Sequence, residues 1–409
     1  MNNKEIIDLF NQVSVNTLVN IVYDRKKPRR VNPKLLTLVD ESKIPELKPL
    51  HKLKKNIKNN CKHTDQVHLL AVGDILFHGG LHTQAILEKN GFESLWAPVQ
   101  KYMNQANLIY GNLEGPSAPG VNASGKFKPN ATDNYDPDNG IYSTGTEGIS
   151  YAFNFHPTAL KALKKSGFTL VSTANNHAFD RKQLGIYKTI ETLDEIGLNF
   201  VGTSNPSSSR ELYKVIYKNG MQIAFVSCTY GIQGGVVNEN IISYCFEKDS
   251  SPNIKLIKTI NSLANKNDLV VLLPHWGTEY DFTINELQKK LADSAIAAGA
   301  RLILGSHPHF VQPVEIRKNK NGEIESIIAF SLANFVTNQM PYDYKNTSMQ
   351  EKTFPQRVSM LFFLNIQKTN HKITFENPRL LPVYMTSRKQ NSKHIRELIP
   401  AYPELYKGQ

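Results

Sequence analysis

At 409 residues, with 40% apolar and 21% charged residues, the chain has the composition of an ordinary soluble globular protein that can bury a sizeable core. Its three cysteines include no CxxC pair, which argues against a disulfide framework and a thiolate metal site and predicts buried or idle thiols. No run approaches about 18 consecutive apolar residues, and the first residues lack a basic segment followed by an apolar core, so we expect a cytoplasmic protein without a transmembrane helix or signal peptide.

The net charge of +12 is concentrated at the start of the chain, where residues 1–66 contain fourteen Lys and Arg against seven Asp and Glu. A basic segment of this kind suits a solvated surface, or contact with a membrane, a nucleic acid or an anionic polymer. We expect residues 1–66 to be a basic N-terminal extension with one or two short helices. Nucleic acid is not the expected partner, because only the charge would support it.

From Val67 onward the sequence contains long apolar runs, and we place the expected folded domain at residues 67–385. Continuous apolar runs are typical of strands that are buried on both faces of a sheet. Such runs occur at residues 67–75, 107–114, 168–177, 222–228, 268–277, 301–309, 326–335 and 358–366. Apolar residues at three- and four-residue spacing predict helices at residues 94–105, 157–168, 183–197 and 286–299.

Residues that start or stop helices support this reading. Pro157 suits a first helical position, and Gly167, Gly197 and Gly299 suit C-terminal caps. The alternation of strands and helices predicts an α/β sandwich with a largely parallel core. Residues 386–409 are expected to form a basic, helical C-terminal tail.

The segment at residues 115–150 breaks the alternation, because it is rich in Gly, Asn, Asp, Ser and Pro. A long irregular segment inside a compact domain is usually either functional or disordered. Since it starts directly after Glu114, we expect it to rim the functional site.

Polar side chains that can bind metals follow five of the expected strands, at the point where each strand ends. Asp74 ends the first of these strands, and Asn112 and Glu114 end the second. The third strand ends in Asn175, Asn176 and His177, the fourth in His275, and the fifth in His307 and His309. Taken alone, an Asp in such a place is more often a turn or cap residue, and a His is more often structural. In open α/β sheets, however, ligands bind beyond the carboxyl ends of the strands, so the coincidence over five strands predicts one site.

The chemistry of these side chains suits a pair of divalent cations. Carboxylate, amide and imidazole groups are all ligands of manganese, iron and zinc. Two such ions can activate water and clamp the oxygens of a substrate. His307 and His309 alternate in the segment GSHPH, so on an extended segment they would face the same side, and Gly305 and Ser306 would let the backbone approach closely.

Six motifs, GD, GNLEGP, ANNHAFD, LPHWGTEY, LGSHPHFVQPVE and FSLANF, occur in this order over roughly residues 67–340 and resemble the CapA family. These are bacterial capsule and poly-γ-glutamate biosynthesis proteins, which are similar to calcineurin-like metallophosphoesterases. The resemblance implies a four-layer α/β/β/α sandwich of the metallo-dependent phosphatase type, with one or two divalent metal ions between the sheets. Because family members are often anchored to membranes, it leaves membrane association open.

The resemblance also implies roles for single residues. One metal ion would be held by Asp74 and His309 and the other by Asn176, His275 and His307, with Glu114 as the bridging carboxylate. His177 stands where the phosphoesterases keep a histidine that acts as general acid, and Asp180 would either orient it or cap the next helix. Further candidates, for substrate binding, are Asn112, Asn175 and Asn334.

The sequence departs from the family pattern at two positions. Leu76 stands where the phosphoesterases have a second histidine, so the pocket of Asp74 lacks an imidazole, and His78 is a poorer fit to that role. Ala333 replaces the usual glycine of the last motif. Three nearby residues are expected to be structural, with Arg301 and Arg317 at the surface and Trp276 in packing contacts.

Two functions of different classes follow from the resemblance. The first is a metal-dependent hydrolase that directs water at an amide or phosphoester of an anionic polymer or a phosphorylated substrate. The second is a non-catalytic component that binds the polymer or assembles with other components of a capsule-synthesis complex, and the missing imidazole at Leu76 favours it. The sequence identifies neither the substrate nor the metal.

Overall fold

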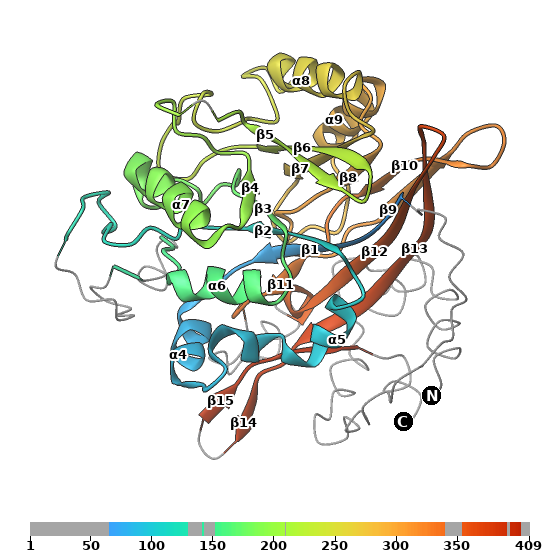
Figure 1. Cartoon of the computed structure of the whole chain (residues 1–409). Helices are drawn as coiled ribbons and strands as arrows, with labels where there is room; N and C mark the ends of the chain where they lie inside the picture. The colour runs from blue at the N-terminus through green and yellow to red at the C-terminus, as the bar shows by residue number, and fades with distance from the viewer. Residues whose placement is uncertain are drawn as a thin grey trace.

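The computed structural model describes residues 65–129, 141–142, 152–208, 210–339, 354–390 and 393–401 (Figure 1). The expected N-terminal extension lies outside these ranges except for its last two residues, and so does most of the second half of the irregular segment. The helices expected in the extension and the domain boundaries therefore stay predictions.

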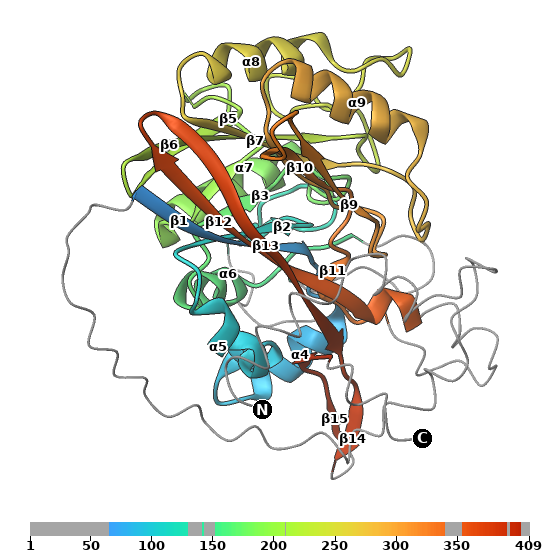
Figure 2. The same ribbon diagram turned by 90° about the vertical axis from the view of Figure 1, so that its right-hand side faces the viewer.

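The larger sheet has eight strands among the described residues. They are β1 (Asp65–Ile75), β2 (Leu108–Leu113), β3 (Leu170–Ser172), β4 (Asn199–Val201), β11 (Asn334–Val336), β12 (Val358–Thr369), β13 (Lys372–Met385) and β16 (Leu398–Pro400). Their order is β16-β13-β12-β1-β2-β3-β4, and β11 pairs with the end of β1. Strands β1 to β4 are parallel, whereas β12 runs antiparallel to β1 and forms a long hairpin with β13 (Figure 2).

The smaller sheet has six strands among the described residues, in the order β5-β6-β7-β8-β10-β9. They are β5 (Tyr213–Lys218), β6 (Met221–Thr229), β7 (Leu269–His275), β8 (Leu302–Leu304), β9 (Val314–Lys318) and β10 (Ile324–Ala329). Its four inner strands are parallel, and β5 and β9 are antiparallel edges. The largely parallel core that the sequence predicted is confirmed in both sheets.

Helices cover the outer face of each sheet. They are α4 (Gly79–Leu87), α5 (Gln100–Met103), α6 (Pro157–Lys165), α7 (Lys182–Ile196), α8 (Ile254–Ala264) and α9 (Glu286–Ala297). Helices α8 and α9 lie at the top of Figure 1 and share an apolar core with the smaller sheet, while α4 to α7 share one with the larger sheet. A third core fills the space between the two sheets. The predicted α/β/β/α order of four layers is confirmed.

Strand β1 explains why its sequence reads as a continuous apolar run. Leu69 and Ala71 face the core between the two sheets, and Leu70 and Val72 face the core beneath the helices. Because successive side chains of a strand point to opposite faces, a strand covered on both faces must be apolar at every position.

The predicted helix ends agree with the structure. Pro157 is the first residue of α6. Gly167, Gly197 and Gly299 follow α6, α7 and α9 with φ of 99°, 69° and 109°, the left-handed conformation that glycine adopts without steric cost.

Some elements differ from the prediction. Residues 94–105 form short helical turns around Pro98 in place of one helix, because proline removes a backbone donor. The tail expected to be helical is extended where it is described, with β14 (Arg388–Gln390) and β15 (Lys393–Ile395) in a hairpin and β16 in the larger sheet. Pairing of β16 with β13 outweighs local helical preference there, and the helices α4 and α8 were not anticipated.

The expectation of buried or idle thiols is wrong for two cysteines. Cys228 at the end of β6 and Cys245 form a disulfide, with Cα atoms 4.9 Å apart and a sequence separation of 17. The count of cysteines could not show which of them meet in space. Disulfides are rare in cytosolic proteins, so this bond weighs against the expected cytoplasmic location. Within the described ranges, the helices are too short or too polar to cross a bilayer.

Candidate metal centre

The carboxyl ends of parallel strands from both sheets meet at one place. Asp74 lies one residue before the end of β1, and His275 is the last residue of β7. Glu114 directly follows β2, and Asn176 lies just beyond β3. All four side chains are buried, so a single enclosed site receives groups from four strands.

The six metal-binding candidates lie together in this site. The ligand atoms of Glu114, His307 and His309 lie within 4.8 Å of one another, and so do those of Asp74, Glu114 and His275. Asn176 joins them through its Oδ1, which is 2.9 Å from Nε2 of His275. Glu114 belongs to both groups, which is the position that a bridging carboxylate would occupy.

Glu114 is a buried carboxylate whose burial is costly unless a cation binds to it. It is fully buried, and neither of its carboxylate oxygens has a hydrogen-bond partner. Its Oε1 is 3.5 Å from Nε2 of His275 and 3.9 Å from Nε2 of His309. Burial and the neighbouring Asp74 raise the pKa of Glu114 well above its ordinary value. A buried carboxylate without donors is costly, and a divalent cation would offset that cost.

Two of the imidazoles are suited to bind a cation. Burial and neighbouring histidines lower the pKa of His275 and of His307 well below the ordinary value, so both rings are neutral. Nδ1 of His307 has no hydrogen-bond partner. Nδ1 of His275 lies 3.0 Å from Oγ of Ser306, which can fix the tautomer that leaves Nε2 for a metal. The donor set therefore fits a divalent metal ion.

His309 differs from the other two imidazoles because it faces a carboxylate. Its Nδ1 lies 3.3 Å from Oδ2 of Asp74 and 2.9 Å from Oδ1 of Asn334. Burial alone would lower the pKa of His309, but the contacts with Asp74 and Asn334 outweigh it and raise the pKa. The division of the six residues into two metal pockets stays a prediction.

His307 and His309 reach the site from a turn, so the extended segment suggested for GSHPH is wrong. Strand β8 ends at Leu304, and the two histidines have φ of 99° and 55°. The backbone N–H of His307 donates to Oδ2 of Asp74 at 3.1 Å, which fixes the turn against β1. The predicted close approach at Gly305 is confirmed, because a Cβ there would lie 2.5 Å from Nε1 of Trp276.

His177 and Asp180 form a pair beside the six candidates. Nδ1 of His177 lies 2.8 Å from Oδ2 of Asp180, and the same carboxylate oxygen accepts a hydrogen bond from the backbone N–H of Phe153. Arg181, not Asp180, holds the cap position of α7. Of the two readings left open by the sequence, the contacts agree with Asp180 as the residue that orients His177.

The three asparagines proposed for substrate binding lie behind the ligand residues. Asn112 donates to Oδ1 of Asp74 at 2.8 Å, and Asn175 donates to the carbonyl oxygen of Leu113 at 2.8 Å. Asn334 contacts His309, as described above, and all three are buried. These contacts favour support of the ligands over contact with a substrate, and their role stays a prediction.

A cavity of about 720 Å³ opens beside the site. His177, Asp180 and His309 line it together with Leu76 and His78. Leu76 thus gives the cavity an apolar wall. Burial lowers the pKa of His78 to about 3, so its ring is neutral. Ala123 from the irregular segment also lines the cavity, which agrees with the expectation that this segment rims the site.

Two residues near the site were missed in the sequence. The ring of Tyr230 lies 4.4 Å from that of His307, measured between centroids. Glu279 lines the cavity and acts electrostatically on Glu114 and His309. Tyr230 directly follows β6, so the position that identified the other candidates would also have identified it.

The three residues expected to be structural have structural contacts. Arg301 donates to the backbone carbonyl oxygens of Glu325 and Ile373. Arg317 pairs with exposed Asp293 at 2.7 Å, and buried Trp276 donates to the carbonyl oxygen of Phe330 at 2.9 Å.

Comparisons with known proteins agree with the motifs. Residues 68–339 match the family described as bacterial capsule synthesis protein PGA_cap. The chain is 28% identical over 282 residues to the capsule biosynthesis protein CapA of Bacillus anthracis, an alignment that covers 68% of this chain and 61% of that protein. It is 29% identical over 270 residues to the PGA biosynthesis protein CapA of Bacillus subtilis (strain 168), covering 66% and 62%. The chain therefore spans about three fifths of the length of these curated relatives.

Similar solved structures are more distant in sequence. A hypothetical protein from Thermus thermophilus is 13% identical with a TM-score of 0.41, covering 77% of this chain and 99% of that one. The calcineurin-like phosphoesterase YfkN from Bacillus subtilis is 13% identical with a TM-score of 0.40, covering 78% and 90%.

Proposed function

The chain belongs to the bacterial capsule synthesis family PGA_cap, and from this premise we propose that it is a metal-dependent hydrolase that acts on an amide or phosphoester in capsule or poly-γ-glutamate synthesis. The observation that supports this most directly is Glu114, a fully buried carboxylate with no hydrogen-bond partner, which lies near the neutral imidazoles of His275 and His307. Such an arrangement is costly without a cation and is suited to bind one.

The ligands of the proposed centre are Asp74, Glu114, Asn176, His275, His307 and His309. One or two divalent ions, of manganese, iron or zinc, would supply an activated water and polarise the bond that breaks. The chain's own groups prepare the site for this. Asp74 fixes the turn of His307, and Ser306 fixes the ring of His275.

His177 is proposed as the general acid for the leaving group. It lines the cavity, and its contact with Asp180 at 2.8 Å leaves Nε2 as the ring nitrogen that can face a substrate. The ring also packs edge-on against Phe153, with centroids 4.7 Å apart, which restricts its rotation. A donor held in one orientation can deliver its proton without first being ordered.

The cavity is proposed to take an anionic substrate. Lys182 lines it, and its ammonium donates to the carbonyl oxygen of Gly234 at 3.5 Å. Its ammonium lies 5.3 Å from the ring centroid of Phe179. A cation in this place could pair with a carboxylate or phosphate next to the scissile bond.

The test is hydrolysis by the full chain after loading with manganese, iron or zinc, with metal content measured by elemental analysis. Oligo-γ-glutamate, a phosphomonoester and a phosphodiester are the substrates. We expect turnover of at least one of them by wild-type protein. His177→Gln should reduce it by about 10²–10⁴-fold with metal content unchanged. The matched control is His371→Gln, since His371 is exposed and remote. Metal-loaded protein that turns over none of these substrates would exclude the proposed hydrolase for these classes.

A second candidate is a non-catalytic component that binds the polymer or assembles a capsule-synthesis complex. The apolar wall at Leu76, in the place of an imidazole, favours it. Binding of oligo-γ-glutamate that survives both His177→Ala and His307→Ala, without turnover in wild type, would support this candidate. Loss of turnover in both variants would support the hydrolase.

A further inference from the structure

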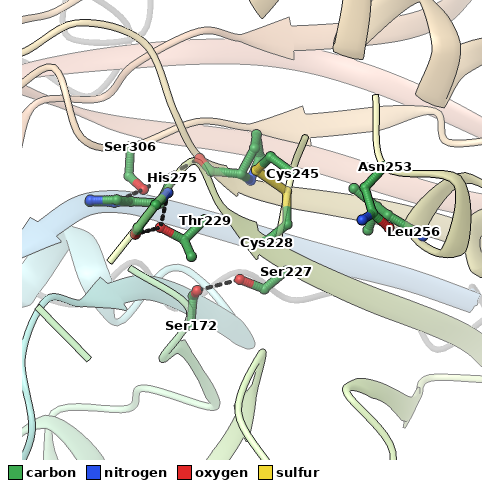
Figure 3. Close-up of a disulfide and its surroundings, with 11 residues drawn as sticks. Ser172, Ser227, Cys228, Thr229, Cys245, Asn253, Leu256, His275 and Ser306 are labelled. Carbon is green, nitrogen blue, oxygen red and sulfur yellow. Dashed lines mark hydrogen bonds between the residues drawn. A yellow bond between two sulfur atoms is a disulfide. The ribbon is translucent and has the colours of Figure 1, made fainter. Parts of the chain in front are cut away.

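The loop that follows β6 is closed by the disulfide and lies against the proposed metal centre. Cys228 lies in β6, and Cys245 lies beyond the loop, 17 residues later. Thr229, next to Cys228, pairs with His275 in the register of β6 and β7. Figure 3 shows the disulfide, Thr229 and His275 in this neighbourhood, with the hydroxyl group of Ser306 next to the imidazole.

Backbone hydrogen bonds at the two ends of the loop add to the disulfide. Thr229 N–H donates to the carbonyl oxygen of Ser243 at 2.9 Å, and Cys245 N–H donates to that of Thr229 at 2.8 Å. Tyr230 N–H donates to the carbonyl oxygen of His275 at 2.9 Å. The disulfide lies two residues from Tyr230 and, together with these hydrogen bonds, holds the start of the loop.

The Tyr230 side chain covers the ligand rings. Its ring lies 4.4 Å from His307 and 6.2 Å from His275 between centroids, and it is stacked on the latter. Nδ2 of Asn176, which is buried and has no hydrogen-bond partner, belongs to the same group of ligand residues. Farther along the loop, Gln233 N–H donates to the carbonyl oxygen of Asn176 at 2.9 Å.

One loop thus contacts Asn176, His275 and His307, which come from three different segments of the chain. Groups that orient metal ligands typically change metal affinity by about 10–100-fold when they are removed. Reduction of the disulfide removes the covalent closure of this loop and leaves hydrogen bonds to hold it, so the loop gains conformational freedom.

We propose that Tyr230, fixed by the Cys228–Cys245 disulfide, is a positioning residue for the metal pocket of Asn176, His275 and His307, so that reduction of the disulfide weakens metal binding there. This inference rests on the proposed function only in that the pocket binds a divalent ion. In the reduction, one dithiothreitol supplies two electrons and two protons. The S–S bond breaks, two thiols form, and dithiothreitol closes to its cyclic disulfide.

The test measures binding of Co²⁺ by the full chain. Oxidised protein is compared with protein that has been reduced by dithiothreitol and desalted under nitrogen. The readouts are the dissociation constant, from competition with a chelator, and the visible absorption of bound Co²⁺. We expect reduction, the double variant Cys228→Ala/Cys245→Ala and Tyr230→Leu each to weaken Co²⁺ binding by about 10–100-fold and to change the spectrum.

Conservative variants and controls distinguish loss of ligand positioning from loss of the fold. Tyr230→Phe keeps the ring over His307 and should restore most of the affinity that Tyr230→Leu loses. Tyr217→Leu is the matched control, because Tyr217 is 73% exposed on β5, and Cys61→Ser controls for the third thiol. Neither control should change the spectrum. Circular dichroism and thermal melts report whether each variant is folded.

Two failures are distinguishable. Oxidised wild-type protein that binds no Co²⁺ would overturn the proposed metal centre and this inference with it. Tight binding that is the same in oxidised protein, reduced protein and Tyr230→Leu would overturn this inference alone. If the cysteine variant does not fold, the comparison of Tyr230→Leu with Tyr230→Phe still decides the positioning role.

Discussion

Glu114 shows how a single residue can be unfavourable for the metal-free fold and necessary for the site. Its carboxylate is fully buried, has no hydrogen-bond donor and lies beside the carboxylate of Asp74. A buried polar group that lacks a partner costs about 1–3 kcal/mol, and more when it is charged. A bound cation would remove that cost.

Glu114→Gln is therefore expected to stabilise metal-free protein by about 1–3 kcal/mol at neutral pH, because a carboxyl group whose pKa is raised by burial costs stability above its ordinary pKa. The same variant should lose most of the increase in stability that Zn²⁺ or Mn²⁺ gives to wild type. Urea unfolding with and without metal measures both effects. Glu211→Gln, at an exposed position, should change stability by less than about 0.5 kcal/mol. A Glu114→Gln protein that is less stable than wild type without metal would contradict the proposed cost.

Asp180 provides the next test at this scale. Its Oδ2 accepts from His177 and from the backbone N–H of Phe153, so it fixes the orientation of the His177 ring. Asp180→Asn keeps the size but weakens this contact, and we expect turnover to fall about 10–100-fold with metal content unchanged. Asp194→Asn removes an exposed carboxylate that pairs with Arg210 and should leave turnover unaffected. If Asp180→Asn also lost its metal, Asp180 would support the ligands as well as the acid.

The sequence was sufficient to find the candidate ligands but not their geometry. Asp74 and His275 could be identified because parallel strands bring their carboxyl ends to one edge. The turn at His307 and His309 could not, because positive φ at two non-glycine residues is set by contacts with Asp74 and not by local preference. Likewise, nothing in the spacing of Cys228 and Cys245 indicated that they meet.

At the scale of elements, the close pairing of β8 with β10 restricts the residue at which the histidine turn begins. Gly305 directly follows β8, and a Cβ there would lie well inside van der Waals contact with the carbonyl oxygen of Phe330 and 2.5 Å from Nε1 of Trp276. The glycine is required by close approach, since its φ is not positive.

Gly305→Ala is expected to cost about 2–3 kcal/mol, because the backbone of β10 or the buried Trp276 must shift. The shift should also displace His307, so metal affinity should fall together with stability. Gly322→Ala is the matched control, since Gly322 has φ of 80° but no atom within 4 Å of an added Cβ. It should cost only the local strain, about 1 kcal/mol, and leave metal affinity intact. Denaturant unfolding and chelator competition measure the two quantities.

The elements themselves were predictable where burial and local preference agree. Strand β1 is apolar throughout because both of its faces are covered, and α6 and α7 have clear ends. Strand β16 was not predictable, because its conformation depends on pairing with β13, which lies next to it only in the folded chain. Ala333 adopts φ of 60°, a left-handed conformation that glycine adopts at lower steric cost.

At the scale of the whole molecule, the site requires the two sheets to keep their relative position, because Asp74 and Glu114 come from one sheet and His275 from the other. Much of that contact is the apolar core between the sheets. A polar contact adds to it at the far end of the strands. Lys368 of β12 lies 2.9 Å from Asp268, which directly precedes β7, and also donates to the carbonyl oxygen of Gly220.

Lys368→Met is therefore expected to destabilise the protein by about 1 kcal/mol at neutral pH, because this ion pair is partly buried and joins the two sheets. Partial burial alone would raise the pKa of Asp268, but the N–H of Gln222 and the ammonium of Lys368 lower it below its ordinary value. Asp268 therefore contributes fully to the free energy of unfolding above the ordinary aspartate pKa of about 3.9. This contribution is lost as the pH falls through the lowered pKa of Asp268 in the folded protein. The difference in free energy of unfolding between wild type and Lys368→Met should be constant from about pH 7 to 5 and shrink below about pH 4.

Lys372→Met is the control, because it removes a more exposed pair with Glu323 and should cost less than about 0.5 kcal/mol. Urea unfolding across this pH range measures both, and an equal loss in the two variants would show that the contact between the sheets is no stronger than a surface ion pair.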